Sequence, residues 1–143
     1  MSKICETTLR VRYAETDQMK VAYNSNYLVW FEVGRVEMLR ELGFSYLELE
    51  EDGFNLPVVE IKCRYKAPAR YDDELVVRTR LAQMQTSLLR FQYDIVRKAD
   101  GKLLSQGESV HLVVGRDMKR THLPTKYRDA LHAAAEEAQS ATP

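Results

Sequence analysis

The sequence predicts an α+β domain in which an antiparallel sheet of about five or six strands curls around one long helix. The first observation is a segment over residues 27–43 that is apolar on most of its circumference, as a buried helix is. The second is a run of later segments that alternate apolar and polar residues between short turns. Strands joined by hairpins form an antiparallel sheet, and a helix apolar nearly all round needs a sheet curled about it.

Local patterns place the elements up to the long helix. Residues 9–13 alternate as a half-buried strand does, and residues 14–20 form a polar loop. Residues 24–26 read Asn-Ser-Asn, whose short side chains can accept hydrogen bonds from the free amides of a helix start. The helix is therefore expected to begin near Tyr27 and to end at Gly43.

The elements after the long helix are shorter. A second helix is expected over residues 45–50. Four strands then follow, over residues 59–65, 75–81, 89–95 and 103–115. In the first of these, Val59 and Ile61 are expected on a buried face. Residues 121–123 could add an edge strand, and a terminal helix is expected over residues 125–139.

Composition excludes several classes of protein. The 143 residues are expected to form a single domain, residues 1–143. The 21 basic and 21 acidic residues balance, whereas nucleic-acid-binding proteins carry a basic excess. No apolar run approaches the roughly 18 residues that span a bilayer. Cys5 and Cys63 are far apart and the three histidines are scattered, so we expect reduced thiols, a cytoplasmic location and no metal site.

One carboxylate, Asp17, lies in the loop before the long helix. A helix start offers unpaired backbone amides and a partial positive charge. Amides that polarise a carbonyl, beside a carboxylate that attacks it or activates water, make an acyl-transfer site. The alternative is that Asp17 only caps a turn.

The other face of the predicted sheet is charged. Its residues are Lys62, Arg64, Arg78, Arg80, Arg90 and Asp94. A solvated face explains this pattern, and the alternative is that some arginines hold the phosphates of a ligand. A nucleic-acid-binding sheet is disfavoured because no exposed aromatic residues are interleaved with the arginines.

Two stretches resemble a known family. The first is Arg-Tyr-Ala-Glu-Thr-Asp-Gln-Met over residues 12–19, followed by matching residues at 21–23, 26–28, 31–32 and 35. It resembles the 4-hydroxybenzoyl-CoA thioesterase family of hotdog-fold acyl-CoA thioesterases. The second, over residues 65–73, is similar to the signature of the branch associated with the Tol–Pal envelope system. The likeness spans roughly residues 9–124.

The resemblance implies a hotdog fold, in which two copies pair their sheets into a homodimer, often within a homotetramer. It implies hydrolysis of an acyl-CoA thioester, without metal or cofactor, at a site on the dimer interface. The family's catalytic carboxylate falls on Asp17, and its carbonyl-polarising backbone amide falls near Asn24.

Two residues depart from the family pattern. Lys20 stands where Gly is common, and Gly allows a backbone angle that Lys reaches only at a cost. Lys20 could also bind a coenzyme phosphate. Asn24 stands where His is common, so a proton-exchanging role of that His is absent, although Asn still donates hydrogen bonds.

Other residues are expected around the substrate. Val59, Glu60 and Ile61 are expected to line the acyl pocket, and Tyr23 is expected either in its wall or in the core. Contacts with the coenzyme are expected from Ser87 and Arg90. Glu32, on the apolar helix, is either a second candidate acid or a buried ion-pair partner of Arg35 or another base.

Two rival functions are compatible with a hotdog fold. A hotdog dehydratase or hydratase needs a His paired with an acid, yet no His precedes residue 111. A non-catalytic acyl-CoA or acyl-carrier binding module, or an envelope-complex partner with a decayed site, is kept open by Lys20 and Asn24. Release of free thiol from acyl-CoAs distinguishes that module from a thioesterase.

Overall fold

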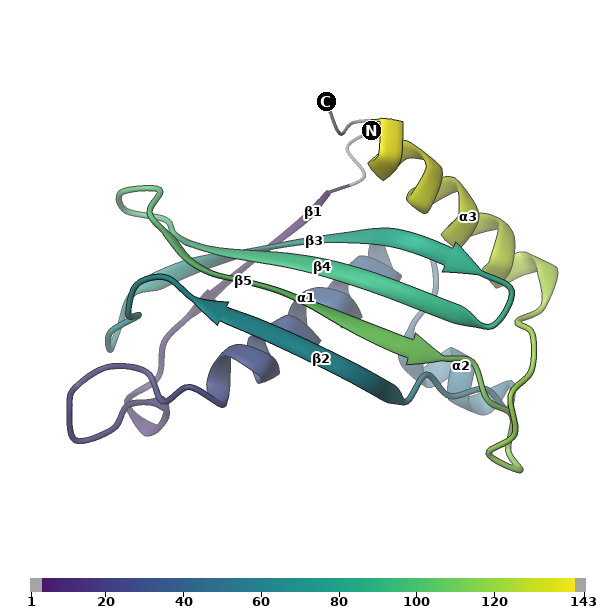
Figure 1. Cartoon of the computed structure of the whole chain (residues 1–143), viewed down its shortest axis with the longest axis horizontal. Coiled ribbons are helices and arrows are strands. Elements are labelled where there is room, and N and C mark those ends of the chain that lie inside the picture. Colours follow the sequence, from purple (N-terminus) through teal and green to yellow (C-terminus); the bar gives the residue numbers. More distant parts are fainter. Residues whose placement is uncertain (1–3, 141–143) are drawn as a thin grey trace.

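Five strands form one antiparallel sheet in the computed structural model, which describes residues 4–140 and the side chains as far as residue 135. The strands are β1 (Cys5–Arg10), β2 (Val58–Tyr65), β3 (Glu74–Gln85), β4 (Leu88–Arg97) and β5 (Leu103–Leu112). The helices are α1 (Asn26–Glu41), α2 (Tyr46–Glu51) and α3 (Thr125–Ser140), with a 3-10 turn at Tyr13–Glu15. The strand order β1-β3-β4-β5-β2 leaves β1 and β2 as the two edges (Figure 1).

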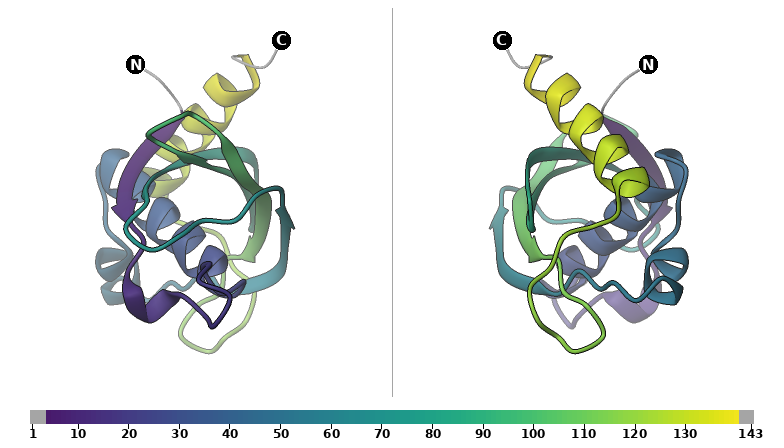
Figure 2. Two further views of the ribbon diagram at one scale, coloured as in Figure 1. Left: turned by 90° about the vertical axis from the view of Figure 1, so that its left-hand side faces the viewer. Right: turned by 90° about the vertical axis from the view of Figure 1, so that its right-hand side faces the viewer.

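The sheet curls around α1, as Figure 2 shows in views along the long axis of the molecule. Seven residues of α1 are buried: Tyr27, Trp30, Phe31, Gly34, Arg35, Met38 and Leu39. A Cβ atom on Gly34 would lie 2.4 Å from the Thr79 Oγ1 atom of β3, so glycine lets the helix lie close on the sheet. The predicted arrangement of a curled antiparallel sheet around one helix is confirmed.

The helix α1 is buried on one side only, so the expectation of burial nearly all round was wrong. Val29 and Val33 are 47% and 37% exposed. The sheet covers one side of the helix, and the described segments leave these two apolar side chains partly exposed. The helix also ends at Glu41, two residues before Gly43, which has φ 104° as a glycine after a helix end often does.

The edge strand β2 is the second departure. Its alternating sequence predicted one buried face, yet Val59 is 52% and Ile61 is 37% exposed. β2 pairs only with β5, along one edge. By contrast, β3 and β4 bury every second side chain along most of their length, as the sequence predicted.

Two boundaries also differ from the prediction. The first strand is Cys5–Arg10 rather than residues 9–13, because the chain bends at Val11 and forms the Tyr13–Glu15 turn. Residues 121–123 do not form a strand: the isolated bridge to Val114 is made by Arg120, and Thr121 N donates to Val113 O at 2.9 Å. The terminal helix begins at Thr125, as expected.

A chain of buried polar groups joins α1 to the sheet. The Arg35 Nη1 group donates to the Tyr93 hydroxyl at 3.0 Å, and this hydroxyl lies 2.5 Å from Ser109 Oγ. Ser109 Oγ lies 2.8 Å from His111 Nε2, and His111 Nδ1 lies 2.9 Å from the Leu56 carbonyl oxygen. These contacts give the buried hydroxyls and the imidazole partners away from water, whereas Arg35 Nε is buried without a hydrogen bond.

Candidate active site

Asp17 lies at the base of a tight hairpin loop before α1. Its N–H donates to the Val21 carbonyl at 3.0 Å, and the Lys20 N–H donates to the Asp17 carbonyl at 2.9 Å. Its carboxylate oxygen Oδ1 accepts from the Met19 N–H at 2.9 Å. The side chain is half-buried, and among the described residues only its Oδ1 atom makes a hydrogen bond. The turn-capping role is therefore present, and it leaves one oxygen for chemistry.

Lys20 closes this hairpin with φ 65°, in the left-handed region. This is the kind of angle that a glycine adopts freely and that costs other residues roughly 1–2 kcal/mol. The cost expected from the exchange of Gly for Lys is thus visible in the backbone. The Lys20 side chain is exposed beside Asp17.

The start of α1 supplies free backbone donors. The N–H groups of Asn26, Tyr27 and Leu28 donate back to carbonyls of residues 23–25, at 3.0, 3.3 and 3.2 Å. Within the part of the chain that the structure describes, the N–H groups of Asn24 and Ser25 make no hydrogen bond. They lie at the positive end of the helix dipole, where a developing negative charge is stabilised.

Backbone pairing brings the hairpin and the helix start together. The two arms of the hairpin meet at an antiparallel bridge between Thr16 and Ala22. The Tyr23 N–H then donates to the Glu15 carbonyl at 2.8 Å. Asp17 and the free amide of Asn24 therefore belong to one small, internally bonded unit.

The predicted pocket residues lie next to this unit or on β2. Tyr23 is exposed, directly before Asn24. Val59, Glu60 and Ile61 are exposed on the edge strand, whose last residue, Tyr65, donates its hydroxyl to the Asn24 carbonyl at 2.8 Å. A pocket wall made by these residues stays a prediction.

Ser87 and Arg90 lie apart from Asp17 within one chain. Ser87 sits in the β3–β4 turn, at the opposite end of the long axis from the hairpin of Asp17 (Figure 1). It is buried, and its hydroxyl accepts from Arg120 Nε at 2.5 Å. Arg90 donates to the Glu108 carboxylate at 3.1 Å. Within one chain, neither residue is brought to Asp17, and their contact with a coenzyme stays a prediction.

Glu32 does not form the expected buried pair with Arg35. The Glu32 side chain is exposed, whereas Arg35 is buried and donates to Tyr93. The two side chains therefore lie in different surroundings, Arg35 against the sheet and Glu32 in solvent. An exposed carboxylate needs no buried partner, so the physical reason for that pair is gone.

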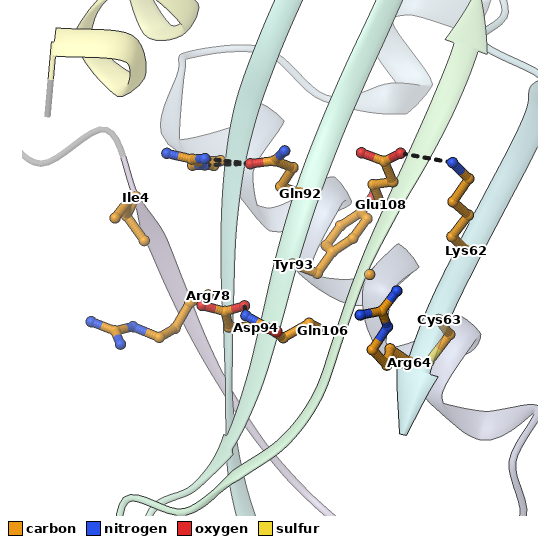
Figure 3. A pocket seen from close by; sticks show the side chains of 12 residues that line it. Ile4, Lys62, Cys63, Arg64, Arg78, Gln92, Tyr93, Asp94, Gln106 and Glu108 are labelled. Atoms are coloured by element: carbon orange, nitrogen blue, oxygen red, sulfur yellow. Dashed lines mark hydrogen bonds and ion pairs between the residues drawn. The ribbon is translucent and has the colours of Figure 1, made fainter. Parts of the chain in front are cut away.

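The charged outer face of the sheet forms a shallow hollow of about 810 Å³ (Figure 3). Two rows of side chains cross its strands: Lys62, Glu108, Gln92 and Arg80 in one, and Arg64, Gln106, Asp94 and Arg78 in the other. Neighbours within this face pair with one another, as in the 3.6 Å contact of Lys62 with Glu108 and the 2.9 Å contact of Arg78 with Glu6. Such pairing favours a solvated face over a phosphate site.

The described residues hold no metal cluster and no membrane-spanning helix. Among the described residues, no three or more His, Cys, Asp or Glu side chains gather as metal ligands do. No helix in the described part of the chain is long and apolar enough to cross a membrane.

Sequence reasoning missed Glu15, which is buried two residues before Asp17. A buried acid in a polar loop leaves no periodic signal. Only its position inside the family-like motif over residues 12–19 could have drawn attention to it.

Comparisons with known proteins identify the family to which the chain belongs. A family model described as the thioesterase-like superfamily matches residues 11–134. The chain is 37% identical over 139 residues to the putative acyl-CoA thioesterase YneP of Bacillus subtilis, covering 95% of this chain and 98% of that protein. It is 36% identical over 100 residues to the acyl-CoA thioester hydrolase YbgC of Escherichia coli O6:H1, covering 70% and 74% of the two chains.

Solved structures show the same fold. Protein TT1821 from Thermus thermophilus superposes with a TM-score of 0.87 at 38% identity, over 91% of this chain and 98% of that one. The DHNA-CoA thioesterase of Staphylococcus aureus superposes with a TM-score of 0.85 at 31% identity, over 96% and 91%. The predicted hotdog fold is confirmed, and the chain belongs to the thioesterase-like superfamily.

Proposed function

We propose that this protein hydrolyses the thioester of an acyl-coenzyme A at the unit formed by Asp17 and the start of α1. The observation that carries the proposal is the pair of unbonded N–H groups at Asn24 and Ser25, in the same bonded unit as the Asp17 carboxylate. Support also comes from the relatives, which are named acyl-CoA thioesterases and thioester hydrolases.

The two groups that act on the thioester, the Asp17 carboxylate and the free amides of α1, come from the same chain. The thioester carbonyl oxygen accepts a hydrogen bond from the N–H of Asn24 or Ser25, which stabilises the negative charge that develops on it. In the first route, Asp17 takes a proton from water, the hydroxide adds to the carbonyl carbon, the C–S bond breaks and the thiolate takes up the proton. In the second, Asp17 itself adds to the carbon, the thiolate leaves, and water hydrolyses the resulting anhydride. One well-placed donor of this kind contributes about 3 kcal/mol to the transition state.

The site is proposed to be completed by a second copy of the chain. The outer edge of β2 is unpaired in the described structure, and it carries exposed apolar residues: Val58, Val59, Ile61 and Tyr65. Val29 and Val33 of α1 are exposed as well. A homodimer that pairs the two β2 edges would extend the sheet and remove these side chains from water. Tyr23, Val59, Glu60 and Ile61 would then line an acyl pocket between the subunits, and two such dimers would make the homotetramer.

Thiol release from a panel of aromatic and aliphatic acyl-CoAs tests the proposal, with wild type and Asp17→Asn side by side. The Asn side chain keeps the oxygen that accepts from Met19 N–H, so the turn remains capped while the carboxylate is lost. We expect kcat to fall by about 10²- to 10⁴-fold, the usual contribution of a general base. Full activity in Asp17→Asn would remove this residue from the mechanism.

The matched control is Asp117→Asn. Asp117 Oδ1 accepts from the Lys119 N–H at 3.0 Å, which reproduces the turn of Asp17 in another loop. This variant is expected to keep full activity. If the wild type binds acyl-CoA saturably and releases thiol from none of the panel, the non-catalytic binding module replaces the thioesterase proposal.

A further inference from the structure

Glu15 is buried, whereas the residues directly before and after it are not. Its residue is 5% exposed, and it is the only Asp or Glu that is buried among residues 4–135. A buried carboxylate is costly unless hydrogen bonds satisfy it. The hydrogen bonds of Glu15 must therefore offset the cost of burying its carboxylate.

Both carboxylate oxygens of Glu15 accept hydrogen bonds from different segments. Oε1 accepts from the Arg12 N–H at 2.8 Å, and Oε2 accepts from Trp30 Nε1 at 3.0 Å. The Arg12 guanidinium lies 3.6 Å from Oε2. Trp30 is itself buried in α1 and packs against Tyr27, with ring centroids 4.8 Å apart. The carboxylate thus ties the 3-10 turn to the first turns of α1.

The backbone carbonyl of Glu15 makes a second pair of contacts. It accepts from the Tyr23 N–H at 2.8 Å and from the Asn26 Nδ2 group at 2.9 Å. Glu15 is therefore bonded to the residues on both sides of Asn24 and Ser25. Four donors converge on one residue, and Asp17 follows it by two positions.

We infer that Glu15 is a positioning residue, which fixes the Asp17 carboxylate relative to the free amides of Asn24 and Ser25. The inference rests on the proposed function and adds the residue that sets its geometry. A carboxylate suits this place because Arg12 and Trp30 both donate, and a carboxylate offers acceptors only. A glutamine would offer one acceptor and turn its amino group toward a donor.

Steady-state kinetics of Glu15→Gln, Trp30→Phe and the double variant test the inference. Misplacing a reacting group by about 1 Å costs roughly 100-fold in rate. We expect kcat of Glu15→Gln to fall by roughly 10- to 100-fold, with KM within about threefold of wild type, since the substrate contacts remain. The double variant should be no slower than Glu15→Gln, because both changes break the same bond.

The matched control is Asp52→Asn, which removes a carboxylate that accepts from the Tyr127 hydroxyl. Asp52 follows α2, at the opposite end of the long axis from the hairpin (Figure 1). A general loss of stability would lower the melting temperature of both variants, whereas only Glu15→Gln should change kcat. A kcat of Glu15→Gln within about twofold of wild type would overturn the inference.

Hydrogen exchange of the backbone amides gives a readout that does not depend on activity. Glu15→Gln should exchange about tenfold faster over residues 13–25, at unchanged rates in β4 and β5. Unchanged exchange over residues 13–25 would overturn the positioning role. An inactive wild type, or a fully active Asp17→Asn, would instead overturn the proposed function, while the exchange rates would still decide the role of Glu15.

Discussion

His111 makes the stability of this protein depend on pH. It is fully buried in β5, and this burial lowers its pKa to about 4, to which the nearby Arg35 charge contributes, although the bond to the Leu56 carbonyl acts in the opposite direction. The Leu56 carbonyl oxygen can only accept, so Nδ1 of the ring carries a proton. In the neutral ring, Nε2 is then the acceptor for the Ser109 hydroxyl, 2.8 Å away.

The sign and size of the effect follow from the pKa. The unfolded chain binds the proton with a pKa near 6.5, and the native chain only near 4. The native state is therefore favoured above pH 6.5, and this stability is lost progressively as the pH falls from 6.5 to 4. At about 1.36 kcal/mol per pH unit, the loss is roughly 3 kcal/mol.

Urea unfolding between pH 7 and pH 4 measures this loss, with His111→Gln beside the wild type. The variant lacks the titrating ring. The difference in free energy of unfolding between wild type and variant should therefore shrink by roughly 3 kcal/mol as the pH falls from 7 to 4. His122→Gln, at an exposed position, should follow the wild type. An equal gap between wild type and His111→Gln at pH 7 and pH 4 would refute the reasoning.

Three other changes probe the fold and the interface. Gly107→Ala would place Cβ 2.4 Å from the Lys62 carbonyl oxygen, so urea unfolding should show a loss of about 1–3 kcal/mol. Gly115→Ala, with its nearest neighbour at 3.3 Å, is the control and should lose less. Lys20→Gly relieves the backbone strain of φ 65°, so the melting temperature should not fall. A raised KM of this variant for acyl-CoA would support phosphate binding by Lys20. Ile61→Lys should give a monomer with little activity in light scattering and thiol release, and an active Ile61→Lys monomer would exclude the shared site.

The sequence predicted the elements whose environment lies within one chain. The alternation in β3 and β4 identified their buried faces, because α1 and the sheet cover each other. The same alternation failed in β2, and the apolar stripe of α1 failed at Val29 and Val33. A pattern of apolar residues says that a face avoids water, and it does not say whether the same chain or a second copy covers it.

The residues of the candidate site also differ in how far the sequence could place them. Asp17, Lys20 and the start of α1 could be placed from the motif and its likeness to a family, because they are neighbours along the chain. Glu15 could not, since its role arises from Trp30, which is 15 residues away and meets it only after folding. The exposed position of Glu32 could not be predicted either, because helical periodicity alone leaves open which face meets the sheet.

The central claim is that Asp17 and the free amides at the start of α1 hold a thioester carbonyl between them. A crystal structure with a non-hydrolysable acyl-CoA, in which CH₂ replaces the thioester sulfur, measures this directly. We predict that the carbonyl oxygen lies about 3 Å from the backbone nitrogen of Asn24 or Ser25. We also predict an Asp17 oxygen about 3–3.5 Å from the carbonyl carbon, or joined to it through one water. A carbonyl that faces solvent, with Asp17 remote from it, would contradict the account.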